Sequence, residues 1–266
     1  MEVAMDLSLL NQFFGIAFES EKEPILSIPA ADLLNREQMD IVIHKCAELQ
    51  KAIGLELPAT FVGLSLFGLI GGIQLALAMH NRLLDLSLAN VTFQIVDRGT
   101  YLHGVLYVQE LRWTEAPEAG REEWLTAFWT DYFGGFINRV MNVTAESAGV
   151  KPDLIWNQFA ARMRFASDYV EENMPDEQVK ERFRGDHELL LQLAPGIFGR
   201  KKNPFDFKPR YLDSPYAPGK KILMRSACCM YDHRENGVKC YNCPRLLTAE
   251  REEMRLEIEA SRAASS

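Results

Sequence analysis

Four of the five cysteines lie between positions 228 and 243, and their spacing carries the most specific chemistry in the sequence. Cys228 and Cys229 are adjacent, while two residues separate Cys240 from Cys243, which gives the pattern C-C-x10-C-x2-C. Two thiolates separated by two residues can point at one metal centre from a tight turn. Adjacent side chains in extended backbone point to opposite faces, which suits a single tetrahedral zinc ion poorly. A cluster with two irons can share four thiolates, so the pattern predicts a metal site.

Three kinds of site are compatible with the cysteines alone. Residues 1–6 show no basic segment before an apolar run, so we expect no secretory signal and a reducing cytoplasm, where disulfides are rare. A bond between adjacent cysteines would also be strained. Structural zinc held by four thiolates and an iron–sulfur cluster fit the spacing equally well. His233 lies between the two cysteine pairs, but a Rieske-type site needs a second histidine.

Composition and the absence of nucleotide-binding motifs narrow the class of protein. The chain has 266 residues and 47% hydrophobic content, so it can bury a full core. Its formal net charge of −8 disfavours nucleic-acid binding. No G-x-x-x-x-G-K-[ST] phosphate loop occurs, which disfavours an ATP-dependent enzyme, and no flavin or nicotinamide fingerprint is evident. If the cysteines hold a redox centre, we therefore expect another protein to donate the electrons.

The rest of the chain predicts an α+β fold, with a mainly helical body, a small antiparallel β-sheet and a cysteine-bearing C-terminal lobe. Residues 57–79 contain no charged side chain and are long enough to span a membrane. Four glycines and a glutamine within this stretch favour one or two core helices instead. Helical spacing predicts further helices over 122–149, 154–172 and 176–193. Cys46, outside the cluster, is expected to be a buried small hydrophobe.

The predicted sheet lies between these helices. Residues 91–96 and 104–108 are rich in β-branched and aromatic side chains, with a turn at 97–99 between them. A shorter apolar run at 86–88 precedes them. These runs predict an antiparallel hairpin or a small meander.

A basic segment precedes the cysteines. Residues 199–225 contain eight lysines and arginines against two aspartates, and four prolines prevent a regular helix. Charge runs are usually solvated surface, so a simple connector is one interpretation. The other interpretation is a positive rim that raises the local concentration of an acidic ligand near the cysteines.

The cysteine pattern resembles the C-terminal signature of the bacterial ferric-siderophore reductases of the FhuF-like family, and all four positions match. Arg225 before the pattern, the helix at 154–156 and the apolar stretch leading into 83–88 are similar in outline. The resemblance implies a [2Fe-2S] cluster held by the four cysteines at 228, 229, 240 and 243. It also implies a siderophore-binding body over 1–199, followed over 200–266 by the basic connector, the iron–sulfur lobe and a terminal helix.

The activity implied by the resemblance is reduction of siderophore-bound Fe(III) to Fe(II) in the cytoplasm, with membrane contact at most peripheral. Siderophores hold Fe(III) through hard oxygen donors, and Fe(II) is held much less tightly, so one electron releases the metal. Electron transfer needs no nucleophile or general base, so we expect no catalytic residue beyond the cluster. The expected partners are a negatively charged ferric siderophore and an electron-donor protein such as a ferredoxin or reductase.

Several residues follow as candidates around the predicted cluster. We expect Arg225 to bind the substrate, with Lys220 and Lys221 next, and Tyr241 and Asn242 to lie near the cluster sulfurs. Two alternatives stay open. One is a siderophore-binding or biosynthetic protein with a zinc-clipped tail and no redox role, and the other is a generic iron–sulfur electron carrier.

Overall fold

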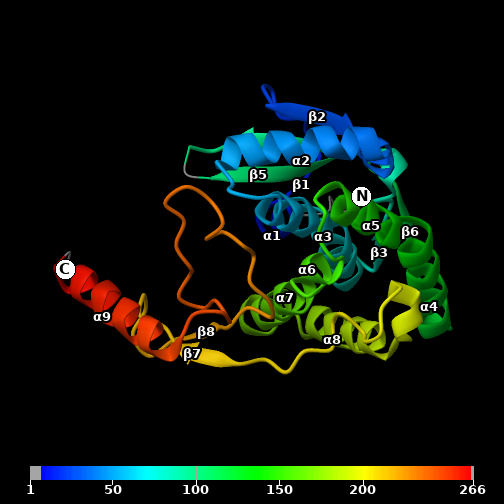
Figure 1. The fold of residues 1–266 in the computed structure, drawn as a ribbon. Coiled ribbons are helices and arrows are strands. Elements are labelled where there is room, and N and C mark those ends of the chain that lie inside the picture. Colours follow the sequence, from blue (N-terminus) through cyan, green and yellow to red (C-terminus); the bar gives the residue numbers. More distant parts are fainter. Residues whose placement is uncertain (1–6, 100, 265–266) are drawn as a thin grey trace.

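A long apolar helix, α3 (Glu56–His80), forms the centre of the fold in this computed structural model, which describes residues 7–99 and 101–264 (Figure 1). A four-stranded sheet and α2 lie on one side of α3, and α7 and α8 lie on the other (Figure 1). Residues 1–6, where the sequence shows no secretory signal, lie outside the described residues. The arrangement confirms the predicted α+β class.

The helices vary from a single turn to seven turns. The other α-helices are α1 (Ser8–Phe14), α2 (Arg36–Gln50), α4 (Arg121–Tyr132), α5 (Asn138–Ser147), α6 (Asp153–Trp156), α7 (Phe159–Asn173), α8 (Glu177–Gln192) and α9 (Thr248–Ala264). Short 3₁₀ turns are η1 (Ala30–Leu34), η2 (Leu88–Asn90) and η4 (Pro195–Phe198). A π-helical turn, η3 (Phe133–Ile137), joins α4 to α5, so the predicted helical region at 122–149 is confirmed.

The strands form one main sheet and two small ribbons. Their bounds are β1 (Ile16–Ala17), β2 (Leu26–Pro29), β3 (Arg82–Leu84), β4 (Val91–Asp97), β5 (Leu102–Val108), β6 (Trp113–Glu115), β7 (Tyr211–Asp213) and β8 (Lys221–Leu223). The main sheet has the order β1-β5-β4-β2, and β3-β6 and β7-β8 pair separately. β4 and β5 are antiparallel, with Val96 opposite His103, which confirms the predicted hairpin.

The composition of α3 explains its central position. Its glycines let neighbouring elements approach closely: a Cβ on Gly68 would lie 2.1 Å from the backbone oxygen of Phe14. A Cβ on Gly63 would lie 2.2 Å from the side chain of Ile155. α3 is long and apolar enough to cross a membrane, but 83% of its most apolar window is buried inside the protein. The predicted core helix is confirmed as one continuous helix.

Two local predictions were wrong. Residues 86–88 form no strand, because the carboxylate of Asp85 accepts from the amide of Ser87 at 3.2 Å and bends the chain toward η2. The helix predicted over 154–172 is two helices, α6 and α7, separated at Asn157. The helix predicted over 176–193 is confirmed as α8, and the side chain of Asp176 accepts from the amide of Gln178 at its start.

The chain after residue 199 is mostly irregular, as its prolines predict. It forms the β7-β8 ribbon, a loop that contains the cysteines and the exposed helix α9, which projects from the body (Figure 1). None of the described residues of α9 is buried. The division of the chain into 1–199 and 200–266 stays a prediction.

Candidate metal centre

Two hydrogen bonds fix the first cysteine pair against the helical body. The hydroxyl of Thr60, fully buried in α3, donates to the backbone oxygen of Cys229 at 2.7 Å. The side-chain amide of Gln158, just before α7, donates to the backbone oxygen of Cys228 at 2.6 Å. These bonds join residues far apart in sequence, so the body determines where the first pair lies.

The loop between the two cysteine pairs is attached at a second place. The backbone amide of Ile53 donates to the oxygen of His233 at 3.1 Å, and the amide of Glu235 donates to the oxygen of Lys51 at 3.0 Å. This short antiparallel contact lies between α2 and α3. The ten-residue loop is therefore fastened to the body as well as to its own ends.

The four thiols gather into two close pairs. Cys228 makes a side-chain hydrogen bond with Cys243, and Cys229 makes one with Cys240. Cys228 and Cys243 are buried against Leu246, whereas Cys229 and Cys240 are half-buried. In the described part of the chain, no three His, Cys, Asp or Glu side chains gather as ligands for a single ion. Two pairs of thiols match the donor set of a cluster with two irons, each bound by two cysteines.

Backbone amides of the first pair face the sulfurs. The amide of Met230 donates to the sulfur of Cys228 at 3.4 Å, and those of Cys229 and Tyr231 point at the sulfur of Cys229. Met230 has a φ of 58°, a left-handed conformation that lets successive amides converge. Such donors stabilise thiolates and tune a bound cluster.

Tyr241 and Asn242 were predicted to lie near the sulfurs, but their polar groups form hydrogen bonds with backbone oxygens elsewhere. The hydroxyl of Tyr241 donates to the backbone oxygen of Asp213 at 3.1 Å. The side-chain amide of Asn242 donates to the backbone oxygen of Leu223 at 2.9 Å. A tight turn explains this, because the amide of Cys243 bonds to the oxygen of Cys240 and directs the intervening side chains outward. Both side chains anchor the β7-β8 ribbon instead.

The charge around the thiols favours metal binding. The pKa of Cys229 is lowered, because its sulfur accepts from the Cys240 thiol and the Arg225 guanidinium lies near it. The same hydrogen bond raises the pKa of Cys240, and burial raises that of Cys228. A thiolate stabilised by amides and a cation is the form that binds metal. The four thiols, their amides and Arg225 thus fit a [2Fe-2S] cluster.

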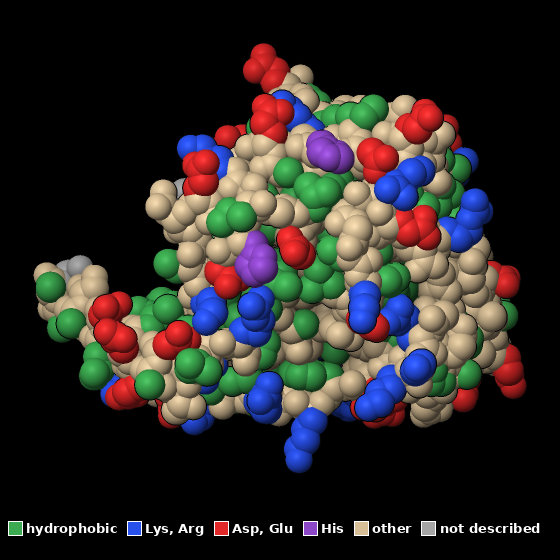
Figure 2. All heavy atoms as spheres, in the orientation of Figure 1, with side chains coloured by type: hydrophobic (Ala, Val, Ile, Leu, Met, Phe, Trp, Pro, Cys, Tyr) green, Lys and Arg blue, Asp and Glu red, His purple; other side chains and the backbone are tan. Residues whose placement is uncertain are grey.

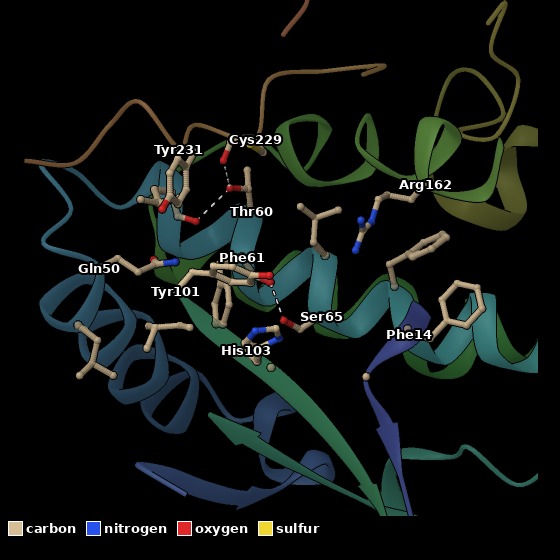
Figure 3. A pocket seen from close by; sticks show the side chains of 18 of the residues that line it. Phe14, Gln50, Thr60, Phe61, Ser65, Tyr101, His103, Arg162, Cys229 and Tyr231 are labelled. Carbon is tan, nitrogen blue, oxygen red and sulfur yellow. Dashed lines mark hydrogen bonds between the residues drawn. The ribbon is translucent and has the colours of Figure 1, made fainter. Parts of the chain in front are cut away.

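A cavity of about 740 Å³ opens beside one of the two thiol pairs (Figure 3). Cys229 and Cys240 line it, whereas Cys228 and Cys243 do not. The other walls come from α1, α2, α3, α7, the β4-β5 hairpin, Arg225 and the loop after Cys229. Aromatic side chains around it include Phe14, Phe61, Tyr101 and Tyr231, and Tyr101 stacks on His103 with ring centroids 4.6 Å apart. This volume is in the range of small-molecule sites.

Three arginines and one carboxylate line the cavity: Arg162, Arg225, Arg234 and Asp97. Arg225 was predicted from sequence, and its Nε is buried without a hydrogen-bond partner among the described residues. Arg162 and Arg234 were missed. Arg234 lies inside the ten-residue loop between the cysteine pairs, and this position could have indicated that it lies near the cluster. Nothing in the local sequence distinguishes Arg162 from other arginines on a helix.

The two predicted lysines lie elsewhere. Lys221 is exposed on β8 and pairs with Asp213 at 2.5 Å, and Lys220 is exposed in the preceding turn. Neither lines the cavity. Lys and Arg side chains gather along the lower part of the face in Figure 2, where Figure 1 places β7, β8 and the chain before them. A role for these lysines in substrate binding stays a prediction.

One other sequence-based expectation concerns the cysteine outside the cluster. Cys46 is fully buried in α2, and burial raises the pKa of its thiol to about 12, which confirms it as a core residue. Trp156 is also buried and packs against Phe133, Phe159 and Phe198, so it belongs to the core.

Comparison with known proteins bears on the cysteine segment. Residues 225–245 match the family model described as the FhuF 2Fe-2S C-terminal domain. The four cysteines at 228, 229, 240 and 243 all lie inside the matched segment. No curated protein matches the chain. The predicted resemblance is thus confirmed: the cysteine segment is similar to the FhuF 2Fe-2S C-terminal domain, and its cofactor is a [2Fe-2S] cluster.

Proposed function

We propose that this protein is a cytoplasmic ferric-siderophore reductase, which passes one electron to siderophore-bound Fe(III) and so releases Fe(II). The observation that carries the proposal is the position of Cys229 and Cys240 in the wall of the 740 Å³ cavity. An iron–sulfur carrier that serves only other proteins needs no such cavity. A reductase for a small chelate needs one beside its redox centre.

The cluster, held by the two thiol pairs, would supply the single electron for this reaction. The residues of the chain bind and orient the substrate. The aromatic walls, among them Phe14 and Phe61, cover the organic part of a chelate and displace water from it. The arginines of the cavity favour negatively charged oxygen donors. Fe(III) becomes Fe(II), no covalent bond to the protein forms, and the hard oxygen donors then hold the softer ion less tightly.

The electron has to enter from a donor protein, for which a ferredoxin or a reductase is our proposal. The Cys228 and Cys243 thiols lie away from the cavity, so a donor can approach the cluster while a substrate occupies the cavity. The burial of α3 is compatible with a protein that works without crossing a membrane. The cytoplasm as the site of the reaction is part of the proposal.

The test uses protein purified without oxygen, reduced, and mixed with ferric siderophores in the presence of an Fe(II)-trapping dye. We expect the visible spectrum of the oxidised cluster to return while one Fe(II) appears per electron transferred. The gallium(III) complex of the same siderophore is the control, because it binds similarly but accepts no electron. Colourless zinc protein would contradict the proposal. So would a reduced cluster that ferricyanide reoxidises and ferric siderophores do not.

A further inference from the structure

The cavity beside Cys229 contains two arginines, Arg162 and Arg225, for which the described residues provide no carboxylate partner. Arg162 projects from α7 into the cavity above α3, toward Ser65 and Phe14 (Figure 3). Its guanidinium has no ion-pair or hydrogen-bond partner among the residues that the structure describes. The neighbouring Arg225 has a buried Nε that is likewise unpartnered within the described chain. Arg162 and Arg225 lie close enough to repel each other.

Other arginines near the cluster loop and on α7 differ from this pair. Arg234 donates to the hydroxyl of Tyr231 at 2.8 Å and lies over its ring. Arg164, two residues after Arg162, pairs with Asp168 at 2.7 Å on the outside of α7. Two neighbouring guanidinium groups repel each other, and an anion bound between them would offset that repulsion.

We propose that Arg162, with Arg225, recognises a negatively charged group of the ferric chelate, and that the protein therefore selects anionic chelates over uncharged ones. The inference rests on the proposed function for the identity of the ligand as a ferric chelate. A guanidinium presents two parallel N–H donors, which match a carboxylate or a pair of phenolate oxygens. Cys229 lines the same cavity, so a chelate anchored at this end brings its metal toward the substrate-side thiols.

The opposite wall of the cavity can hold the rest of such a ligand. Phe61 of α3 and the stacked rings of Tyr101 and His103 face the cavity across from Arg162 (Figure 3). Flat aromatic surfaces pack against the rings of aryl chelating groups. An anionic chelate with aryl donors, such as a catecholate, thus matches both ends of the cavity, and an uncharged hydroxamate matches only the aromatic end.

The test measures binding and not reduction. Cluster-loaded protein is titrated with two redox-inert gallium(III) complexes, a hexadentate tris-catecholate that is triply negative and a hexadentate tris-hydroxamate that is uncharged. We expect tighter binding of the tris-catecholate. Arg162→Gln should weaken that binding about 10-fold or more and leave the uncharged complex unaffected. Arg162→Lys should give an intermediate loss, because it keeps the charge but not the two parallel donors.

Arg164→Gln is the matched control, because it removes an arginine from the same helix outside the cavity. It should bind both complexes like the parent protein. Cluster absorbance and midpoint potential are recorded for every variant. Equal affinity of the parent for the two complexes would overturn the inference. So would an Arg162→Gln variant with a changed potential and unchanged binding, since Arg162 would then serve the charge of the cluster instead.

The outcome separates this inference from the proposed function. Charge-selective binding without reduction of the matching ferric complexes would leave the inference standing and reject the reductase. Reduction of both ferric complexes with no effect of Arg162→Gln would support the reductase and reject the inference.

Discussion

The hydroxyl of Thr60 donates to the backbone oxygen of Cys229 at 2.7 Å and thereby joins the central helix to the cluster loop. The same hydroxyl lies 3.0 Å from the oxygen of Leu57 within α3, so Thr60 continues the helix while it fixes the loop. The residue is fully buried. A backbone oxygen in such a place is costly to leave unpaired, so this contact helps to fix the position of a substrate-side ligand.

Thr60→Val should loosen the cluster without changing its ligands. Valine keeps the shape of threonine but cannot donate, so the oxygen of Cys229 loses its partner. We expect the free energy of unfolding to fall by about 1–3 kcal/mol and an iron chelator to remove the cluster faster. Thr130→Val is the control, because the hydroxyl of Thr130 bonds only within α4 on the surface. Equal chelator sensitivity in the two variants would contradict this role.

The ligand assignment is tested by alanine substitutions at different cysteines. Cys243→Ala removes a buried thiol paired with Cys228, so we expect loss of the [2Fe-2S] absorbance and of bound iron and sulfide. Cys46→Ala should keep both, because the thiol of Cys46 is buried in α2 with its pKa raised to about 12. Iron and sulfide analysis beside the visible spectrum measures the difference. Full cluster content in Cys243→Ala would refute the assignment.

Arg225→Gln should lower the midpoint potential of the cluster. The guanidinium lies near Cys229 and Cys240, and its positive charge favours the more negative, reduced state. At an effective dielectric constant near 20, a unit charge about 6 Å away interacts by about 3 kcal/mol, so removing it should lower the potential by roughly 120 mV for one electron. A redox titration followed by the visible spectrum gives the shift. Lys221→Gln, which changes a charge outside the cavity, should leave the potential unchanged.

The sequence predicts what depends on near neighbours and misses what depends on the fold. The cysteine pattern is local, and so are the β4-β5 hairpin and the apolar α3. Arg162 could not be found, because its position beside Cys229 depends on how α7 packs against α3 and the cluster loop. Lys220 and Lys221 were chosen by counting charge along a segment, and the β7-β8 ribbon directs them to the surface.

Gly68→Ala should destabilise the body. A Cβ at this position would lie 2.1 Å from the backbone oxygen of Phe14, and backbone atoms cannot move aside as a flexible side chain can. We expect a loss of about 1–3 kcal/mol in the free energy of unfolding, despite the better helix propensity of alanine. Gly185→Ala is the matched control in α8, where a Cβ meets no atom within 4 Å. It should be neutral or stabilising by up to about 1 kcal/mol, and denaturant unfolding compares the two.

His187 should make the protein less stable as the pH falls. Burial, with a smaller contribution from Arg164, lowers the pKa of its ring from 6.5 to about 4, and its Nδ1 has no hydrogen-bond partner among the described residues. The unfolded chain therefore takes up a proton first, and stability present above pH 6.5 is lost as the pH falls toward 4. Between pH 7 and pH 5 this group should remove about 2 kcal/mol. Denaturant unfolding at pH 7 and pH 5 measures this decrease in the free energy of unfolding, which should be about 2 kcal/mol smaller in His187→Gln than in the parent protein. The same pH dependence in both proteins would exclude His187 as the cause.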